Sequence, residues 1–220
     1  MTENKNYIPA LKYDWLTKMY DPVIQFTMPE RNFKTALINQ MKITSGHRVR
    51  DFGCGSLTLT IMAAKAHPQT EFFGVDVDEK ILSIAKQKLD NTGISVAIQQ
   101  YDGRKLPYRD NYFDRVMSSL VFHHLTLHQK YYAIEEIRRV LKPSGEIHIA
   151  DFGRPANIFQ RIGFYSVQML DGFETTNDSV NDLLPRVIKE SDFSQVEETG
   201  NYKTLVGTVR LMKGVKATAI

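Results

Sequence analysis

Residues 48–152 alternate between short apolar runs and longer stretches with helical spacing, and this alternation constrains the fold more than any other feature of the chain. Short apolar runs are typical of buried strands, and apolar residues three and four positions apart are typical of helices. Such a series buries a mainly parallel sheet between two layers of helices, and we therefore predict a doubly wound α/β fold. Strands are predicted over residues 47–52, 71–77, 95–100, 113–119 and 146–151, and helices over residues 57–66, 78–90 and 129–141.

The C-terminal part departs from the alternation, because two strand-like runs follow one another with no helix between them. They are separated by a short turn at Gly200 and Asn201, which predicts an antiparallel hairpin over residues 194–212. A second turn is predicted at residues 142–145, since Pro143 cannot extend a helix and Gly145 permits a reversal. The chain is predicted to be one domain with four parts: an aromatic, partly helical N-terminal segment, a cofactor-binding core, a helical insertion on the substrate side and the hairpin, over residues 1–41, 47–152, 153–193 and 194–212.

The composition excludes several classes of protein. A chain of 220 residues with 42% hydrophobic content can bury one substantial core. Its 28 basic and 25 acidic residues leave a net charge of +3, which gives no reason to expect nucleic acid or an anionic membrane as a partner. No apolar stretch approaches the roughly 20 residues of a membrane span. The single cysteine, Cys54, and a polar beginning predict a cytoplasmic protein without disulfides.

A strand that runs into two glycines is the sharpest local feature. Gly53 and Gly55 follow the apolar run at residues 49–52, where glycines allow a tight turn and leave room for a ligand. Asp51 lies just before them, and a negative charge there argues against a pyrophosphate and suits a cationic ligand. The alternative is an ordinary strand-to-helix turn in which Asp51 caps the next helix.

Two further carboxylates follow neighbouring strands. Asp76 ends the apolar run at residues 72–75, where a carboxylate can accept hydrogen bonds from both hydroxyls of a ribose. Capping of the next helix is the competing role for Asp76, although Asp78 suits that position better. Asp102 ends the third strand and can accept a hydrogen bond from an adenine amino group, but aspartate before glycine (Gly103) is also a common turn.

These residues together resemble the class I S-adenosylmethionine-dependent methyltransferases, and within them the small-molecule enzymes related to the ubiquinone/menaquinone C-methyltransferases. The likeness covers most of the chain and is carried by Asp51-x-Gly53-x-Gly55, Asp76, Asp102 with Leu106-Pro107-Tyr108, residues 113–116 and residues 139–146. The resemblance implies a seven-stranded sheet whose last strand is antiparallel. It also implies S-adenosylmethionine as cofactor and S-adenosylhomocysteine as product.

The resemblance assigns the cofactor's parts to residues of this chain. It places Asp51 and the loop of Gly53, Cys54 and Gly55 near the methionine part, Asp76 at the ribose and Asp102 at the adenine. Related enzymes fold an early aromatic segment over the cofactor, which makes Tyr20 a candidate contact. The remaining predicted cofactor contacts are Val77, Gly103 and Ser118.

The chain departs from the family pattern at two places. Leu57 replaces the usual third glycine, and its β-carbon is expected to narrow the loop beside the cofactor. Residues 118–124 replace a segment that contains glycine, arginine and asparagine in the quinone enzymes. The sequence therefore does not assign a quinone precursor as the methyl acceptor.

Methyl transfer from a sulfonium needs positioning and exclusion of water more than a dedicated base. If the acceptor must lose a proton, His123 and His124 are the candidate catalytic residues, because they follow the strand that ends beside the methyl group. The alternative is that both histidines only pack or bond to backbone. Asp151 either faces the acceptor or begins the next segment. No metal site is predicted, since no carboxylate or cysteine completes a recognisable spacing.

The predicted acceptor is a small, apolar or aromatic molecule. Residues 158–173 carry many apolar side chains, which can roof an acceptor pocket, form a dimer contact or pack on the sheet. The oligomeric state is left open. Two other functions compete: a non-catalytic binding protein with the same fold, and a nicotinamide-dependent oxidoreductase, for which Asp51 would be misplaced.

Overall fold

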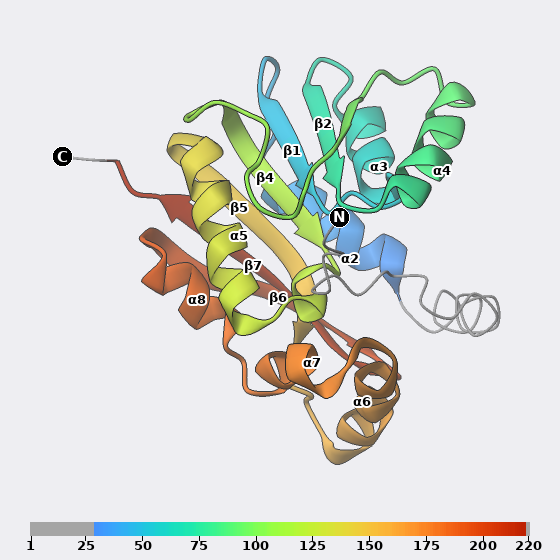
Figure 1. Ribbon diagram of the computed structural model, residues 1–220, viewed down its shortest axis with the longest axis vertical. Coiled ribbons are helices and arrows are strands. Elements are labelled where there is room, and N and C mark those ends of the chain that lie inside the picture. Colours follow the sequence, from blue (N-terminus) through green and yellow to red (C-terminus); the bar gives the residue numbers. More distant parts are fainter. Residues whose placement is uncertain (1–28, 219–220) are drawn as a thin grey trace, which may run out of the picture.

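The sheet of the computed structural model, which describes residues 29–218 without the side chains of residues 170, 171, 173 and 174, has seven strands (Figure 1). Their order is β3-β2-β1-β4-β5-β7-β6. Pairs among the first five strands are parallel, whereas β7 runs antiparallel to both of its neighbours. The strands are β1 (Arg48–Phe52), β2 (Glu71–Asp76), β3 (Ala97–Gln100), β4 (Phe113–Ser119), β5 (Leu141–Gly153), β6 (Phe193–Thr204) and β7 (Gly207–Lys216). The predicted doubly wound sheet with an antiparallel C-terminal hairpin is confirmed.

Helices cover both faces of this sheet. The helices are α2 (Glu30–Gln40), α3 (Thr58–Ala66), α4 (Glu79–Asp90), the 3₁₀ turn η1 (Phe122–His124), α5 (Leu127–Val140), α6 (Ile158–Asp171), α7 (Phe173–Val180) and α8 (Leu184–Glu190). Buried residues of α2, α3 and α6 share one apolar cluster on one face, and those of α5 and α8 share another on the opposite face. None of the helices within residues 29–218 is long and apolar enough to cross a bilayer.

Local sequence explains where helices α4 and α5 begin. The Asp78 carboxylate accepts hydrogen bonds from Lys80 N and Ile81 N and so caps α4. Thr126 and Gln129 form a reciprocal capping box at the start of α5. Both caps satisfy backbone donors that the first helical turn leaves without partners.

The hairpin turn lies elsewhere than predicted. β6 continues through Gly200 and Asn201, and Asn201 pairs with Arg210 on β7. The chain reverses instead at residues 205–206, where the Thr204 hydroxyl accepts from Val206 N and donates to Gly207 O. The predicted turn at Gly200 and Asn201 is therefore wrong. Side-chain bonds of Thr204 close a turn that has no glycine or asparagine at its centre.

The turn predicted at residues 142–145 lies inside a strand. β5 begins at Leu141, directly after α5, and its pairing with β4 shifts register between Phe113 and Arg115. Ser144 adopts a left-handed φ of 61° within the shifted segment. The proline and glycine thus mark a bulge in β5, which ends the helix without adding a separate loop.

Candidate functional site

Strand order places the predicted site residues at one edge of the sheet. β1 lies between β2 and β4, and the chain winds outward in opposite directions from this point. The loops that follow β1 and β4 therefore diverge at the carboxyl ends of the strands, which is where doubly wound sheets bind ligands (Figure 1). The glycine loop, Asp76, Asp102 and η1 all follow the carboxyl ends of these parallel strands.

The glycine loop is pinned to β2 by backbone hydrogen bonds. The N–H groups of Gly53 and Cys54 both donate to Val75 O at 2.9 Å. Gly53 has a φ of 69°, and a β-carbon there would lie 2.5 Å from Val121 Cγ2. Glycine is thus required at Gly53 both for its conformation and for the close approach of the loop after β4.

Leu57 does not narrow this loop in the way the sequence suggested. Its φ is 63°, a left-handed conformation that favours glycine, yet its side chain is fully buried. The side chain packs in an apolar cluster with Cys54 and Ile61 instead of lying over the loop. Gly74 on β2 leaves space for the Leu57 side chain, because a β-carbon added at Gly74 would lie 2.9 Å from Leu57 Cδ2.

Asp76 joins the glycine loop to the end of β2. One carboxylate oxygen accepts from Gly55 N at 2.9 Å, and the other accepts from Asp78 N at 3.0 Å. Burial raises the pKa of Asp76, although these backbone hydrogen bonds oppose the shift. The alternative in which Asp76 caps α4 is wrong, because Asp78 fills that position. Each oxygen keeps a lone pair that can accept from a ligand.

Asp102 and its neighbours lie beside Asp76 at the end of β3. The N–H of Tyr101 donates to Asp76 O at 3.2 Å, which holds the two strand ends together. Asp102 is exposed, and one of its carboxylate oxygens accepts from Arg104 N at 2.9 Å. Gly103 has a φ of 77°, and a β-carbon there would approach Val77 at 3.7 Å. The ends of β2 and β3 therefore bring Asp76, Val77, Asp102 and Gly103 together.

Asp51 lies at the end of β1 but is enclosed by protein. Its side chain is 1% exposed, and one oxygen accepts from the Thr60 hydroxyl at 2.6 Å. Burial raises the pKa of this carboxyl to about 6. It does not cap α3, because that helix has Leu57 at its N-cap and no side-chain cap. Asp51 is thus a buried acid that carries most of its charge at neutral pH.

Two predicted cofactor contacts have their polar side chains turned into the protein. The Ser118 hydroxyl is fully buried and donates to Phe52 O at 2.9 Å, so it joins β4 to β1. The Cys54 side chain is buried in the cluster with Leu57, and burial raises the pKa of its thiol. We do not carry either side chain into the proposed site, although the backbone of Cys54 belongs to the glycine loop. Tyr20 lies outside the described residues.

The two histidines lie in η1, directly after β4. His123 is 4% exposed, and its Nδ1 lies 2.7 Å from one oxygen of the Asp151 carboxylate. The other Asp151 oxygen accepts from Val121 N at 2.9 Å and from Phe122 N at 2.6 Å. Burial on its own would raise the pKa of Asp151, but His123 and the N–H groups of Phe152 and Phe122 together hold it below its usual value. Asp151 is therefore a charged group that fixes both η1 and the His123 ring.

His124 has a different environment from His123. The two rings lie 4.0 Å apart between centroids, and burial together with neighbouring His123 lowers the pKa of His124 to about 3. His124 is thus neutral at physiological pH. Among residues 29–218, no group of three or more histidine, cysteine, aspartate or glutamate side chains is arranged to hold a metal ion.

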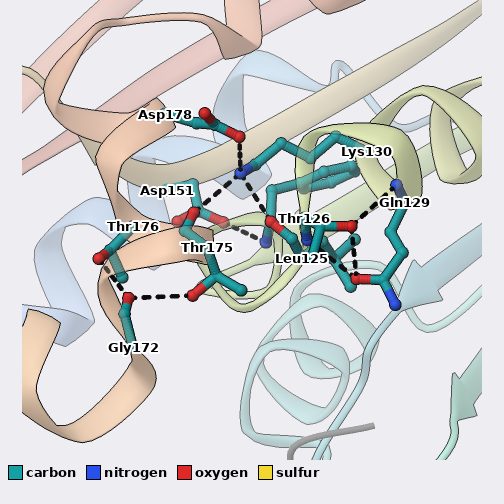
Figure 2. A network of polar contacts seen from close by, with 10 residues as sticks. Leu125, Thr126, Gln129, Lys130, Asp151, Gly172, Thr175, Thr176 and Asp178 are labelled. Carbon is teal, nitrogen blue, oxygen red and sulfur yellow. Dashed lines mark hydrogen bonds and ion pairs between the residues drawn. The ribbon is translucent and has the colours of Figure 1, made fainter. Parts of the chain in front are cut away.

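A buried lysine beside this site was missed by sequence reasoning. Lys130 on α5 is 1% exposed, and its ammonium donates to Leu125 O at 2.7 Å, Thr175 O at 3.0 Å and Asp178 Oδ2 at 2.9 Å. Figure 2 shows the Lys130 ammonium between these three groups, which come from the segment between η1 and α5 and from α7. All three ammonium protons are satisfied, so Lys130 fastens α7 to the segment that follows η1. Its position on the apolar face of α5, one turn from Ile134, was the available signal.

Comparison with known proteins agrees with this geometry. Residues 49–145 match the model of a methyltransferase domain. A ubiquinone/menaquinone biosynthesis C-methyltransferase UbiE from Cupriavidus taiwanensis is 33% identical over 125 residues, which cover 56% of this chain and 51% of the relative. The enzyme of the same name from Pseudomonas aeruginosa is 31% identical over 229 residues, covering 94% of this chain and 85% of the relative. The YcgJ protein from Bacillus subtilis superimposes with a TM-score of 0.72 at 16% identity, over 86% of this chain and 100% of that chain.

The fold and its glycine-loop edge define a Rossmann-like methyltransferase domain. The chain belongs to the class I S-adenosylmethionine-dependent methyltransferases, in the group related to UbiE. It spans about half the length of several of the curated relatives it matches, 51% of the Cupriavidus enzyme among them.

Proposed function

We propose that the protein transfers the methyl group of S-adenosylmethionine to a small, apolar or aromatic molecule. The observation that carries this proposal is the Asp76 carboxylate, which bridges the glycine loop and the end of β2 at the point where the sheet's winding reverses. A carboxylate there suits the two hydroxyls of a ribose, and family membership supplies the identity of the nucleoside.

The donor's other parts are assigned by chemistry. The buried charge of Asp51 suits the ammonium of the methionine part, because a cation stabilises a carboxylate that burial otherwise destabilises. Asp102 and Gly103 extend the edge beyond Asp76, where the adenine ring would follow the ribose. Val77 lies between them at the end of β2. Binding at Asp51 would lower its pKa, so we expect donor affinity to rise as pH increases through about 6.

The acceptor side is built on His123 and Asp151. Because the Asp151 carboxylate accepts from Nδ1, the neutral His123 ring has its basic nitrogen at Nε2. When the acceptor must lose a proton, its X–H bond breaks as the X–CH₃ bond forms, and Nε2 takes the proton while the sulfonium becomes a neutral thioether. His124 has a pKa of about 3, so it is neutral and only a weak base, and we assign the proton transfer to His123. The chain's other task is to orient the acceptor and exclude water.

An apolar acceptor is supported by the relatives, which are named for ubiquinone and menaquinone biosynthesis. The apolar surroundings of His123, among them the Phe152 ring at 5.0 Å, are consistent with such a molecule. The identity to these relatives is only 31–33%, so we propose the same chemical class of acceptor rather than the same molecule.

Thermal unfolding with each ligand tests the proposal. S-adenosylmethionine and S-adenosylhomocysteine should raise the melting temperature, whereas NADH should not, because only a ligand that binds the folded state stabilises it. Incubation of the protein and isotopically labelled donor with a metabolite extract should then label an organic-soluble product. Stabilisation by NADH alone would favour an oxidoreductase, and stabilisation by the donor without any labelled product would favour a non-catalytic binding protein.

A further inference from the structure

One face of α6 presents large apolar side chains to solvent. Ile158, Phe159, Ile162 and Met169 are 66%, 80%, 60% and 78% exposed. Their spacing places them on one side of the helix. The opposite side is apolar as well, since Phe164 and Val167 are buried in the core cluster against the sheet. A helix that is apolar on both sides is normally covered on both, so the exposed side of α6 is an interaction surface.

The hairpin tip extends this surface. Leu205, in the turn between β6 and β7, is 68% exposed. The turn crosses α6 at Gly163, where an added β-carbon would lie 2.2 Å from Leu205 O. We call the four α6 residues and Leu205 the α6 patch. Figure 1 shows α6, α7 and the hairpin tip gathered at one end of the molecule, away from α3 and α4.

Basic side chains border the α6 patch. Arg154 and Lys203 are exposed and have no acidic partner within residues 29–218. Arg161 contacts only neutral groups in that part of the chain, the Gln168 side chain at 2.8 Å and the Tyr165 ring. Two cavities of about 490 and 300 Å³ share Arg154 and Pro155, and the smaller one is lined by Ile158 and Arg161 as well. Positive groups and apolar groups therefore meet at the start of α6.

The acidic side chains described nearby are fewer than the basic ones. Arg210 lies 2.7 Å from Asp182 and 3.3 Å from Glu198, the one acidic residue that lines the larger cavity, so one basic group serves two carboxylates. With Arg154, Arg161 and Lys203, the described side chains of this region have four basic groups against two acidic ones, and the excess charge is positive. The chain as a whole carries only +3, so the local excess is not visible in the overall composition.

We propose that the α6 patch and its basic border bind the surface of an anionic lipid bilayer. An amphipathic helix lies in the interface with its apolar side among the acyl chains, while basic residues attract anionic headgroups. The α6 patch supplies the apolar side chains, and its border supplies the basic residues beside them. The smaller cavity is lined by Arg154 and Arg161 together with the exposed Ile158, so basic groups that can bind a phosphate lie beside an apolar side chain. This proposal is independent of methyl transfer, because binding to vesicles is measured without donor or acceptor.

Charge favours a bilayer over two other occupants of the α6 patch, a second copy of this chain and the chain's own residues 1–28. In a two-fold dimer built on the α6 patch, the basic border of one copy would meet the α6 patch or the basic border of the other, and neither supplies an acidic partner for Arg154 or Lys203. The N-terminal residues 1–28 bring no complementary charge, since their acidic and basic side chains are equal in number: Glu3, Asp14 and Asp21 against Lys5, Lys12 and Lys18.

Vesicle flotation of the full chain tests the proposal. The protein should float with vesicles of phosphatidylcholine and phosphatidylglycerol, and much less with phosphatidylcholine alone. The double variant Phe159→Ser/Ile162→Ser should lose at least about 10-fold in partitioning onto the anionic vesicles. Both side chains are exposed, so the variant should fold. Ile84→Ser, at a 48% exposed position on α4, is the matched control and should bind as the unmodified chain does.

A charge-reversal pair tests the basic border. Arg154→Glu/Lys203→Glu should reduce binding to anionic vesicles by at least roughly 30-fold, because each lost basic residue removes about a kilocalorie per mole of attraction and each new glutamate adds repulsion. Lys65→Glu/Lys80→Glu changes net charge equally at exposed positions of α3 and α4 and should reduce binding far less. Equal losses in the two variants would overturn the proposal, because attraction would then follow net charge alone.

Two other results would overturn it. The first is failure of the unmodified chain to float, together with a dimer in sedimentation that Phe159→Ser/Ile162→Ser dissociates. The second is failure to float together with a shift in the emission of Trp15, the single tryptophan, when the same variant is made. The α6 patch would then be covered by a second copy in the first case and by the chain's own N-terminal segment in the second.

Discussion

The donor side and the acceptor side of this site are built in different ways. On the donor side, each carboxylate is held by groups close to it in sequence or on the adjacent strand, as when Asp76 accepts from Gly55 N and Asp78 N. On the acceptor side, His123 is held by Asp151, and Lys130 joins α5 to Asp178 on α7. The donor side is thus specified by short motifs, and the acceptor side by long-range pairs that only the assembled fold brings together.

Breaking the Lys130 cluster should have the largest effect on stability. Lys130→Ala leaves Asp178 and two carbonyl oxygens without a buried cation, so we expect a loss of about 3–5 kcal/mol in the free energy of unfolding, measured with denaturant. The matched control is Arg186→Ala, which removes an exposed ion pair with Glu190 and should change stability far less. Similar small effects in both variants would show that the acceptor side does not depend on Lys130.

Asp151→Asn tests whether that residue positions His123. The variant keeps the shape of the side chain but removes the charge that holds the His123 ring, so methyl transfer should fall by about 100-fold where the acceptor must lose a proton. Imidazole nitrogen shifts in NMR should show the proton on Nδ1 in the unmodified protein and a mixture of tautomers in the variant. An unchanged tautomer and an unchanged rate would reduce Asp151 to an anchor for η1.

The charged Asp51 carboxylate on the donor side should lower the free energy of unfolding at neutral pH. Its pKa is raised to about 6 in the folded protein, so the folded state loses stability as pH rises from about 4 to about 6 and stays lower above that. Asp51→Asn should flatten this window and raise stability at pH 8 by about 2–3 kcal/mol, while weakening donor binding. Unfolding at a series of pH values checks this; a variant less stable than the unmodified chain at pH 8 would contradict it.

The smallest expected effect is the difference in stability between two variants at Leu57, which should follow an unusual order. Leu57→Gly and Leu57→Ala both lose a buried side chain, but only glycine adopts a φ of 63° without strain. The glycine variant should therefore be more stable than the alanine variant by about 1 kcal/mol, the reverse of the usual preference within a helix. Thermal unfolding of the pair measures the difference, and greater stability of the alanine variant would mean that the left-handed conformation is not retained.

The sequence was sufficient for the sheet, the glycine loop and the strand-end carboxylates, because apolar periodicity and glycine spacing are local signals. It was not sufficient for the hairpin turn, since residues 205–206 contain no turn-forming residue and the Thr204 hydroxyl closes the reversal. The position of Ser118 in the chain did not reveal that its hydroxyl donates to Phe52 O.

Long-range partners were the other limit on prediction. His123 and Asp151 were both recognised as candidates, but their contact depends on the pairing of β4 with β5. Lys130 was missed because a lysine on an apolar helix face is explained only by the carbonyl and carboxylate groups of α7. Side chains that join distant segments carry no local pattern from which their partners can be predicted.

Calorimetric titration of S-adenosylmethionine into Asp76→Ala and Asp78→Ala tests the donor side most directly. Both variants remove a carboxylate from the same turn, but only Asp76 is proposed to hold the ribose, while Asp78 caps α4. We expect the dissociation constant to rise by about 5- to 150-fold in Asp76→Ala, and by little in Asp78→Ala, which should lose about 1 kcal/mol of stability instead. Unchanged affinity in Asp76→Ala would contradict the proposed donor site.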